Sequence, residues 1–291
     1  MELLNQMPPY NLFGLEGQSY EKAKVVAIPV PYDSTTSYKS GARDGPHAII
    51  EASRNIELFD IETETDISKI GIYTTEELAP DFSSPENTVL GIKKEVGIIA
   101  EQSKIPLLIG GEHTISIGGV GALIERNKDM SILYFDAHSD SRDSYLGAKT
   151  CHACVARRIM EMTDSVYIIG VRSSDRESIQ KYRSNMMLMK DIKSRERKEI
   201  INTILNNLND KVYISIDLDV LDPSEMPSVG TPEPEGMHFG ELREILKGVL
   251  ERKQLVGFDV VELSPIQGII APNYLAAKLI YLIISYSLGG V

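Results

Sequence analysis

Residues 131–140 of the chain read Ser131-Ile132-Leu133-Tyr134-Phe135-Asp136-Ala137-His138-Ser139-Asp140. The first half of this stretch is a nearly unbroken apolar run, without the alternation of a half-exposed strand. Such a run is typical of a strand whose two faces are both covered. The second half carries Asp, His and Asp at alternate positions, which in extended chain point to one side. The stretch therefore predicts a buried strand that ends in a group of chemically active side chains.

Apolar runs of strand length recur along the chain, separated by longer helical patterns. Ser84-Pro85-Glu86 is a typical helix start, with serine as the cap and proline in the first turn. The predicted strands cover residues 24–30, 69–73, 106–109, 131–135, 166–171, 186–189, 211–216 and 255–261. The predicted helices cover residues 89–104, 194–208, 239–253 and 274–288.

This alternation indicates an α/β fold with a mostly parallel sheet between layers of helices. No internal repeat, linker or low-complexity stretch divides the chain, so we expect residues 1–291 to form a single domain. A chain of this length, with 42% apolar residues, can bury about three quarters of its unfolded surface. That is enough for a deep site from which water is largely excluded.

Charge and hydropathy argue against several classes of partner. The formal charge of −12 disfavours nucleic acids and anionic membranes, which bind through clustered Lys and Arg. Residues 274–288 are largely apolar, but Lys278, Tyr281, Ser285 and Tyr286 interrupt them, and a span needs about 20 apolar residues. We expect a buried helix there. The N-terminus lacks the pattern of an export signal, so we expect a cytoplasmic protein.

The two cysteines, Cys151 and Cys154, are too few for a disulfide framework. Their spacing imitates a redox Cys-x-x-Cys motif. That motif normally opens a thioredoxin-like βα unit, whereas this pair lies in mid-chain among other candidate site residues. The sequence leaves the role of the pair open.

Four segments place charged or imidazole side chains directly after a predicted strand. The carboxyl ends of strands in an open parallel sheet border its ligand crevice, so the four segments can meet at one site. The segments are Ile109-Gly110-Gly111-Glu112-His113-Thr114, Tyr134-Phe135-Asp136-Ala137-His138-Ser139-Asp140, Ser215-Ile216-Asp217-Leu218-Asp219-Val220-Leu221-Asp222-Pro223 and Gly257-Phe258-Asp259-Val260-Val261-Glu262-Leu263-Ser264-Pro265.

Buried carboxylates are costly unless they are paired or bound to metal. Four aspartates and two histidines supply about the negative charge that two divalent ions would neutralise. A set that is rich in carboxylate oxygen and lacks thiolate favours manganese over a structural zinc. A single Asp-x-Asp is more often a polar turn, but four such segments together predict a two-metal centre.

The four segments resemble the signature motifs of the ureohydrolase family, which includes arginase, agmatinase and guanidinobutyrase. The likeness extends from Ser40-Gly41-Ala42-Arg43-Asp44-Gly45-Pro46 to Ser264-Pro265, in the family's order and spacing. It implies a three-layer α/β/α sandwich on an eight-stranded, mostly parallel sheet. It also implies a ring-like homo-oligomer and hydrolysis of a small cationic guanidino substrate to release urea.

The resemblance further implies the role of each site residue. One manganese ion would be held by His113, Asp136, Asp140 and Asp217, and the second by Asp136, His138, Asp217 and Asp219. A water that bridges two such ions has a pKa lowered toward neutrality and can attack the guanidinium carbon as hydroxide. Asp140 would orient this nucleophile, Glu262 would bind the guanidinium, and His152 would move protons to the leaving amine.

The chain departs from the family pattern at several positions. Cys151-His152-Ala153-Cys154 stands where the family usually has Ser-His-Gly-Thr, and Glu235 stands where it usually has glycine. The asparagines with which arginases typically bind the amino-acid end of arginine are absent. Asp143 could favour a substrate with a free ammonium tail, so we expect agmatine, converted to putrescine in polyamine biosynthesis. Guanidinobutyrate is the nearest rival, since Arg142 or Lys149 could bind its carboxylate; arginase or formiminoglutamase specificity is a further alternative.

Two other classes of protein fit the sequence less well. A dinuclear phosphoesterase also uses Asp-x-His, but it needs further Gly-Asp and Gly-Asn-His segments and more histidines than the five present. A metal-binding or scaffold protein without activity would be expected to show degraded motifs. Here every ligand position is filled.

Overall fold

Eight parallel strands form the central sheet of the computed structural model, which describes residues 7–289. The strands are ordered β4-β1-β5-β10-β9-β6-β7-β8, and each neighbouring pair is parallel. Their bounds are β1 Val25–Val30, β4 Ile72–Thr74, β5 Ile105–Gly110, β6 Ser131–Phe135, β7 Val166–Val171, β8 Met186–Leu188, β9 Lys211–Asp217 and β10 Gln254–Val261.

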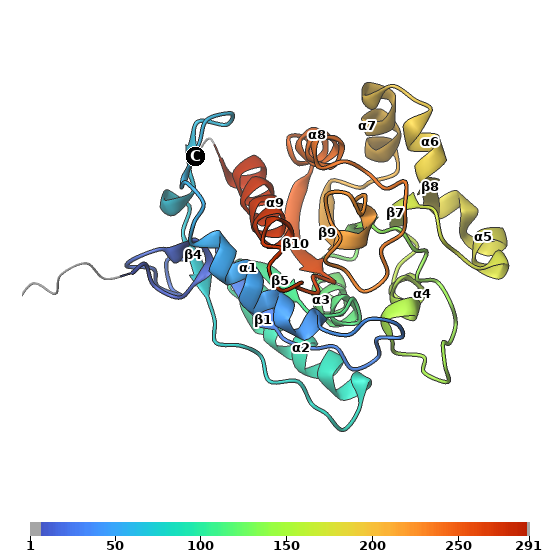
Figure 1. Cartoon of the computed structure of the whole chain (residues 1–291), viewed down its shortest axis with the longest axis horizontal. Helices are drawn as coiled ribbons and strands as arrows, with labels where there is room; N and C mark the ends of the chain where they lie inside the picture. The colour runs from blue at the N-terminus through green and yellow to red at the C-terminus, as the bar shows by residue number, and fades with distance from the viewer. Residues whose placement is uncertain (1–6, 290–291) are drawn as a thin grey trace, which may run out of the picture.

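Helices cover both faces of this sheet (Figure 1). The strands divide their side chains between two separate cores, which is why their sequences are apolar at consecutive positions. In β6, Leu133 and Phe135 pack into the core that contains α1, α7, α8 and α9. Ile132 and Tyr134 pack into the core that contains α2, α3 and α4. The helices are α1 Gly45–Ser53, α2 Pro85–Glu101, α3 Ile115–Ile124, α4 Val155–Met160, α5 Arg176–Tyr182, α6 Met189–Lys193, α7 Arg197–Asn206, α8 Phe239–Leu250 and α9 Ala271–Leu288.

The predicted three-layer α/β/α fold is confirmed, and all eight predicted strands are present. Ser84 caps α2 as expected, accepting a hydrogen bond from the backbone N–H of Asn87 at 3.2 Å. The predicted helix over residues 194–208 is wrong in part, because α6 ends at Lys193 and α7 begins at Arg197. Glu196 has an extended backbone that interrupts the helical run. A two-residue hairpin, β2 Phe59–Asp60 with β3 Thr65–Asp66, was not predicted.

The order of the strands positions the site. β5 and β6 follow one another in the chain, but β10 and β9 return later and lie between them. The four strands that precede the ligand-type segments are therefore the four central strands of the sheet. The expected buried C-terminal helix is α9, and no helix among residues 7–289 is long and apolar enough to cross a membrane.

Candidate active site

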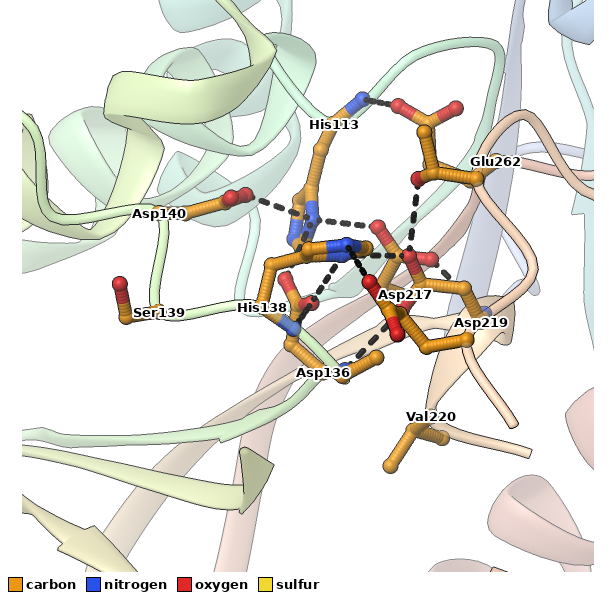
Figure 2. Close-up of polar contacts among 12 residues, drawn as sticks. His113, Asp136, His138, Ser139, Asp140, Asp217, Asp219, Val220 and Glu262 are labelled. Atoms are coloured by element: carbon orange, nitrogen blue, oxygen red, sulfur yellow. Dashed lines mark hydrogen bonds and ion pairs between the residues drawn. The ribbon is translucent and has the colours of Figure 1, made fainter. Parts of the chain in front are cut away.

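The carboxyl ends of the four central strands bring the predicted site residues together (Figure 2). His113 follows β5, Asp217 ends β9 and Glu262 follows β10. The turn that carries His113 is tight, since a Cβ atom on Gly111 would lie 1.9 Å from the carbonyl oxygen of Tyr32. The described structure thus gathers residues from segments as far apart as 113 and 262. All six predicted metal ligands are among them: His113, Asp136, His138, Asp140, Asp217 and Asp219.

Three of these residues form a first group that could hold a metal ion: His113, Asp136 and Asp140. His113 Nδ1 lies 3.3 Å from Asp136 Oδ2 and 3.6 Å from Asp140 Oδ2. Asp217 adjoins the group, with Oδ2 3.0 Å from the same nitrogen. One imidazole nitrogen therefore faces three carboxylates, which is the donor set predicted for the first ion.

A second group consists of Asp136, His138 and Asp219. His138 Nδ1 lies 2.8 Å from Asp219 Oδ2 and 3.5 Å from Asp136 Oδ1. Asp136 belongs to both groups. Asp217 is oriented between them, because its Oδ1 accepts the backbone N–H of Asp219 at 2.9 Å while its Oδ2 faces His113. Asp136 and Asp217 therefore both lie beside the two groups, and their role as bridging ligands stays a prediction.

The chemistry of this cluster fits divalent cations. Burial raises the pKa of Asp217 and of Asp140, and the neighbouring carboxylates raise it further. Asp136 Oδ2 is buried and has no hydrogen-bond partner among the described residues. Carboxylates that repel one another in a buried site, one with a free oxygen, are stabilised by a bound cation.

A hydrogen-bond chain beneath the cluster fixes the protonation of His113. Asp259 is fully buried and accepts the hydroxyl protons of Ser215 at 2.7 Å and of Tyr213 at 2.6 Å. With Asp259 ionised and Ser215 donating its only proton to it, a neutral His113 donates from Nε2 to the Ser215 oxygen, 2.9 Å away. His113 Nδ1 is then left without a proton and faces the carboxylates. An imidazole that coordinates a metal needs this arrangement.

Two site residues have an unusual backbone. Asp140 has φ +44° and Glu262 has φ +68°, a region that costs a residue with a side chain about 1–3 kcal/mol. Neighbouring contacts hold both in place. The Asp140 carbonyl accepts the N–H of Arg157 at 3.1 Å, and the Glu262 N–H donates to the carbonyl of Gly111 at 2.8 Å. Asp140 therefore reaches the cluster through a left-handed turn, and the predicted simple alternation after β6 is wrong at this residue.

A pocket opens above the cluster and encloses about 240 Å³. Asp217, Asp219 and Glu262 line its inner part, and His152 lines its wall. Glu262 is buried; burial raises its pKa, and the charges of Asp217 and Glu112 raise it further. Its Oε1 accepts the backbone N–H of His113 at 2.7 Å (Figure 2). Because burial disfavours the charged form of Glu262, a cationic ligand in the pocket would stabilise its carboxylate.

The turn η4, His152–Cys154, holds His152 at this pocket despite the changed residues around it. Thr35 and Ser37, in the loop after β1, contact the two ring nitrogens. Burial lowers the pKa of His152. Cys151 precedes the turn and Cys154 ends it; both are buried, with Sγ atoms 2.9 Å apart.

The outer part of the pocket differs from the prediction. Asp143 is not among its lining residues; its exposed carboxylate pairs with Arg158 at 2.9 Å and with Lys149 at 3.8 Å. Asp143 and Lys149 are therefore wrong as candidates to bind the substrate tail. Arg142 does line the pocket, but it lies 3.8 Å from Asp175, which lines it too. Asp175 was missed because it reads as the cap of α5, a role that it also has.

Glu235 has φ +61°, a conformation that favours glycine. This explains why glycine is usual at that position in the family that the sequence resembles. The glutamate does not line the active-site pocket. It lines a neighbouring hollow instead, together with Arg172 and Lys190.

Comparison with known proteins agrees with the site. The Arginase family model matches residues 23–285. The chain is 36% identical to N(1)-aminopropylagmatine ureohydrolase of Thermococcus kodakarensis, over 93% of this chain and 92% of that protein. It is 36% identical to agmatinase of Pyrococcus horikoshii, over 91% and 92%. The crystal structure of agmatine ureohydrolase of Thermoplasma volcanium superposes with a TM-score of 0.86 at 33% identity, covering 93% of this chain and 92% of that one. The chain therefore belongs to the arginase family, in which it is an agmatinase-like ureohydrolase.

Proposed function

We propose that this enzyme hydrolyses agmatine to putrescine and urea, with two manganese ions held by the six residues of the cluster. The observation that carries the proposal is a pair of His/Asp groups that share Asp136. The groups lie beneath a pocket into which a further buried carboxylate, Glu262, projects. An oxygen-rich donor set of this kind favours manganese. A cationic group held by Glu262 would lie next to the cluster.

Glu262 is proposed to bind the guanidinium. Because its Oε1 is occupied by the N–H of His113, its Oε2 is the oxygen left for the substrate. An N–H of the guanidinium would donate a charge-assisted hydrogen bond to it. This contact would direct the guanidinium carbon toward Asp217 and Asp219, two acidic residues that also line the pocket.

Two divalent cations bound by the cluster would supply a water whose pKa is lowered toward neutrality. Asp140 is proposed to orient that water by accepting a hydrogen bond from it. Its Oδ2 already accepts the hydroxyl proton of Tyr134 at 3.0 Å, which fixes the side chain. Tyr134 in turn stacks on His113, with ring centroids 4.5 Å apart.

His152 is proposed to deliver the proton that the leaving amine requires. Addition of water to the guanidinium carbon is followed by cleavage of its bond to the alkylated nitrogen, which departs as an amine only if it gains a proton. Imidazole is suited to this transfer near neutral pH. The position of His152 on the pocket wall, beside Ala153 and Tyr145, supports this assignment.

The outer pocket favours a cationic tail. Asp175 is fixed by hydrogen bonds from the N–H and hydroxyl of Ser178, at 2.9 and 2.6 Å. Its charge offsets that of Arg142, which leaves little attraction for the carboxylate of guanidinobutyrate. N(1)-aminopropylagmatine, a longer cation, is the second candidate, because several relatives are named N(1)-aminopropylagmatine ureohydrolase. We further propose that the enzyme acts in the cytoplasm as a homo-oligomer, in polyamine biosynthesis.

A substrate screen tests the proposal. Manganese-loaded protein is incubated with agmatine, N(1)-aminopropylagmatine, arginine and guanidinobutyrate, and urea release is measured; for formiminoglutamate, glutamate release is measured. We expect the highest kcat/KM with agmatine. A higher value with N(1)-aminopropylagmatine would move the assignment to that substrate, and absence of product from every compound would refute the ureohydrolase activity.

A further inference from the structure

Two residues of the loop after β1, Thr35 and Ser37, contact the two ring nitrogens of His152. Thr35 Oγ1 accepts the backbone N–H of His152 at 3.0 Å and lies 3.2 Å from its Nδ1. Ser37 Oγ lies 3.2 Å from Nε2. Thr35 is partly buried, whereas Ser37 is exposed. The ring is therefore anchored through Nδ1, and Nε2 lies on the more accessible side.

Thr35 is itself held by Glu112, a fully buried carboxylate that the proposed reaction does not use. The Thr35 hydroxyl lies 2.6 Å from Glu112 Oε1, and the Thr35 N–H donates to Oε2 at 2.7 Å. Thr114 donates its hydroxyl to Oε1 at 2.5 Å. Glu112 therefore receives these three donors, which are one backbone N–H and two hydroxyls. A carboxyl group that receives several donors is stabilised as the acceptor-only carboxylate.

The number of protons available along the series of hydrogen bonds from Glu112 through Thr35 to His152 determines the tautomer of His152. The Thr35 hydroxyl has one proton, and the short contact to Glu112 Oε1 takes it. Thr35 Oγ1 can then only accept, so the Nδ1 that faces it must carry a proton. In the neutral imidazole, Nε2 is consequently unprotonated, and it is the nitrogen that gains and loses a proton.

We propose that Glu112 and Thr35 are positioning residues for proton transfer by His152, fixing its Nδ1–H tautomer so that Nε2 exchanges the proton with the substrate. The inference rests on the proposed function, in which His152 supplies that proton. The contact between Thr35 and Glu112 joins two loops that are 77 residues apart in the sequence. Glu112 also directly precedes the predicted metal ligand His113. One turn after β5 thus serves both the metal cluster and the proton donor.

The kinetic test uses the metal-loaded full chain and agmatine. Thr35→Val keeps the shape of the side chain and removes the hydroxyl, so we expect kcat to fall about 10- to 100-fold, with KM within about twofold. Thr35→Ser restores the hydroxyl and should recover at least fivefold of that loss. In a His152→Asn background, Thr35→Val should lower kcat by less than about twofold, because the residue it positions is already absent.

Thr150→Val is the matched control, since it removes a hydroxyl two residues before His152 whose partner is Glu86 and not the Thr35 loop. It should leave kcat unchanged. Equal losses from Thr35→Val with and without His152, or a Thr35→Ser variant no better than Thr35→Val, would overturn the proposal.

A second readout does not depend on turnover. Histidine-labelled protein, loaded with diamagnetic zinc, is studied by ¹⁵N NMR, and the His152 signals are identified by their loss in His152→Asn. We expect the Nδ1–H tautomer in the wild type and a mixture in Thr35→Val. An Nε2–H tautomer in the wild type would overturn the inference whatever the activity. If the spectra are as expected but the manganese-loaded protein releases no urea from any substrate, the positioning of His152 is upheld and the proposed function is refuted.

Discussion

Asp136 is the one residue that belongs to both His/Asp groups. Its removal takes a carboxylate from each proposed ion, whereas removal of His113 takes a ligand from one. We therefore expect Asp136→Ala to lose both manganese ions on dialysis and His113→Ala to retain about one per chain. Metal analysis after gel filtration measures this. If Asp136→Ala keeps as much metal as the wild type, the shared-ligand assignment fails.

Variants of Glu262 and His152 should have different kinetic effects, because Glu262 is proposed to bind the substrate and His152 to transfer a proton. Loss of a charge-assisted hydrogen bond in a buried site costs about 2–4 kcal/mol, so Glu262→Gln should lower kcat/KM about 30- to 1000-fold, with a raised KM as part of the loss. His152→Asn should lower kcat by about 10² to 10⁴ and leave KM nearly unchanged. Steady-state kinetics with agmatine, together with metal analysis, decide this. Wild-type turnover in His152→Asn would remove His152 from the mechanism.

The sequence predicted the members of the cluster better than their surroundings. Ligand-type residues after apolar strands can be recognised from local pattern, and the resemblance gave each a role. The partners of His152 and His113 could not be recognised in this way. Thr35 lies 117 residues from His152 and Ser215 lies 102 residues from His113, and each contact is a single hydroxyl. Asp143 was misassigned for the converse reason, since its pairing with Arg158 depends on how the loop folds.

At the scale of single elements, the turn η4 has a backbone that does not need its thiols. The Cys154 N–H donates to the Cys151 carbonyl at 3.0 Å, and Thr35 holds the N–H of His152. The Cys151→Ser, Cys154→Thr double variant should therefore keep more than half of the wild-type kcat with agmatine. Loss of turnover with metal content intact would show instead that the thiols take part in the reaction.

The loop that contains Glu235 offers a test of backbone strain. Glycine adopts its φ of +61° without the cost that a side chain brings, which is about 1 kcal/mol. Part of this gain is offset by the greater freedom of glycine in the unfolded chain. We expect Glu235→Gly to raise Tm by about 1–2 °C in a calorimetric scan. Glu57→Gly, at an exposed position without positive φ, is the control and should lower Tm. A lower Tm for Glu235→Gly would contradict the inference that the backbone at Glu235 is strained.

The elements themselves were largely predictable, and their ends were not. Continuous apolar runs identified the eight strands because both faces of the sheet are covered. The break between α6 and α7 was missed because Ser194, Arg195 and Glu196 include no glycine or proline to mark it. The hairpin of β2 and β3 has only two residues in each strand, too few for a periodic pattern.

At the scale of the whole molecule, the order of the strands decides the chemistry. Local patterns do not reveal that β10 and β9 lie between β5 and β6, yet this arrangement brings four separate segments to one sheet edge. Ligand crevices of open α/β sheets lie at such reversals of strand order. The family resemblance, and not the periodicity of the sequence, predicted that the four segments form one metal site.

We propose that this chain releases urea through a two-metal centre. The most direct measurement starts from protein stripped of metal by chelation and dialysis, adds manganese in steps, and records urea release from agmatine at each step. We predict no activity without metal and a rise that levels off at two equivalents per chain. Urea release by the stripped protein at the full rate, or none at any manganese level, would contradict the account.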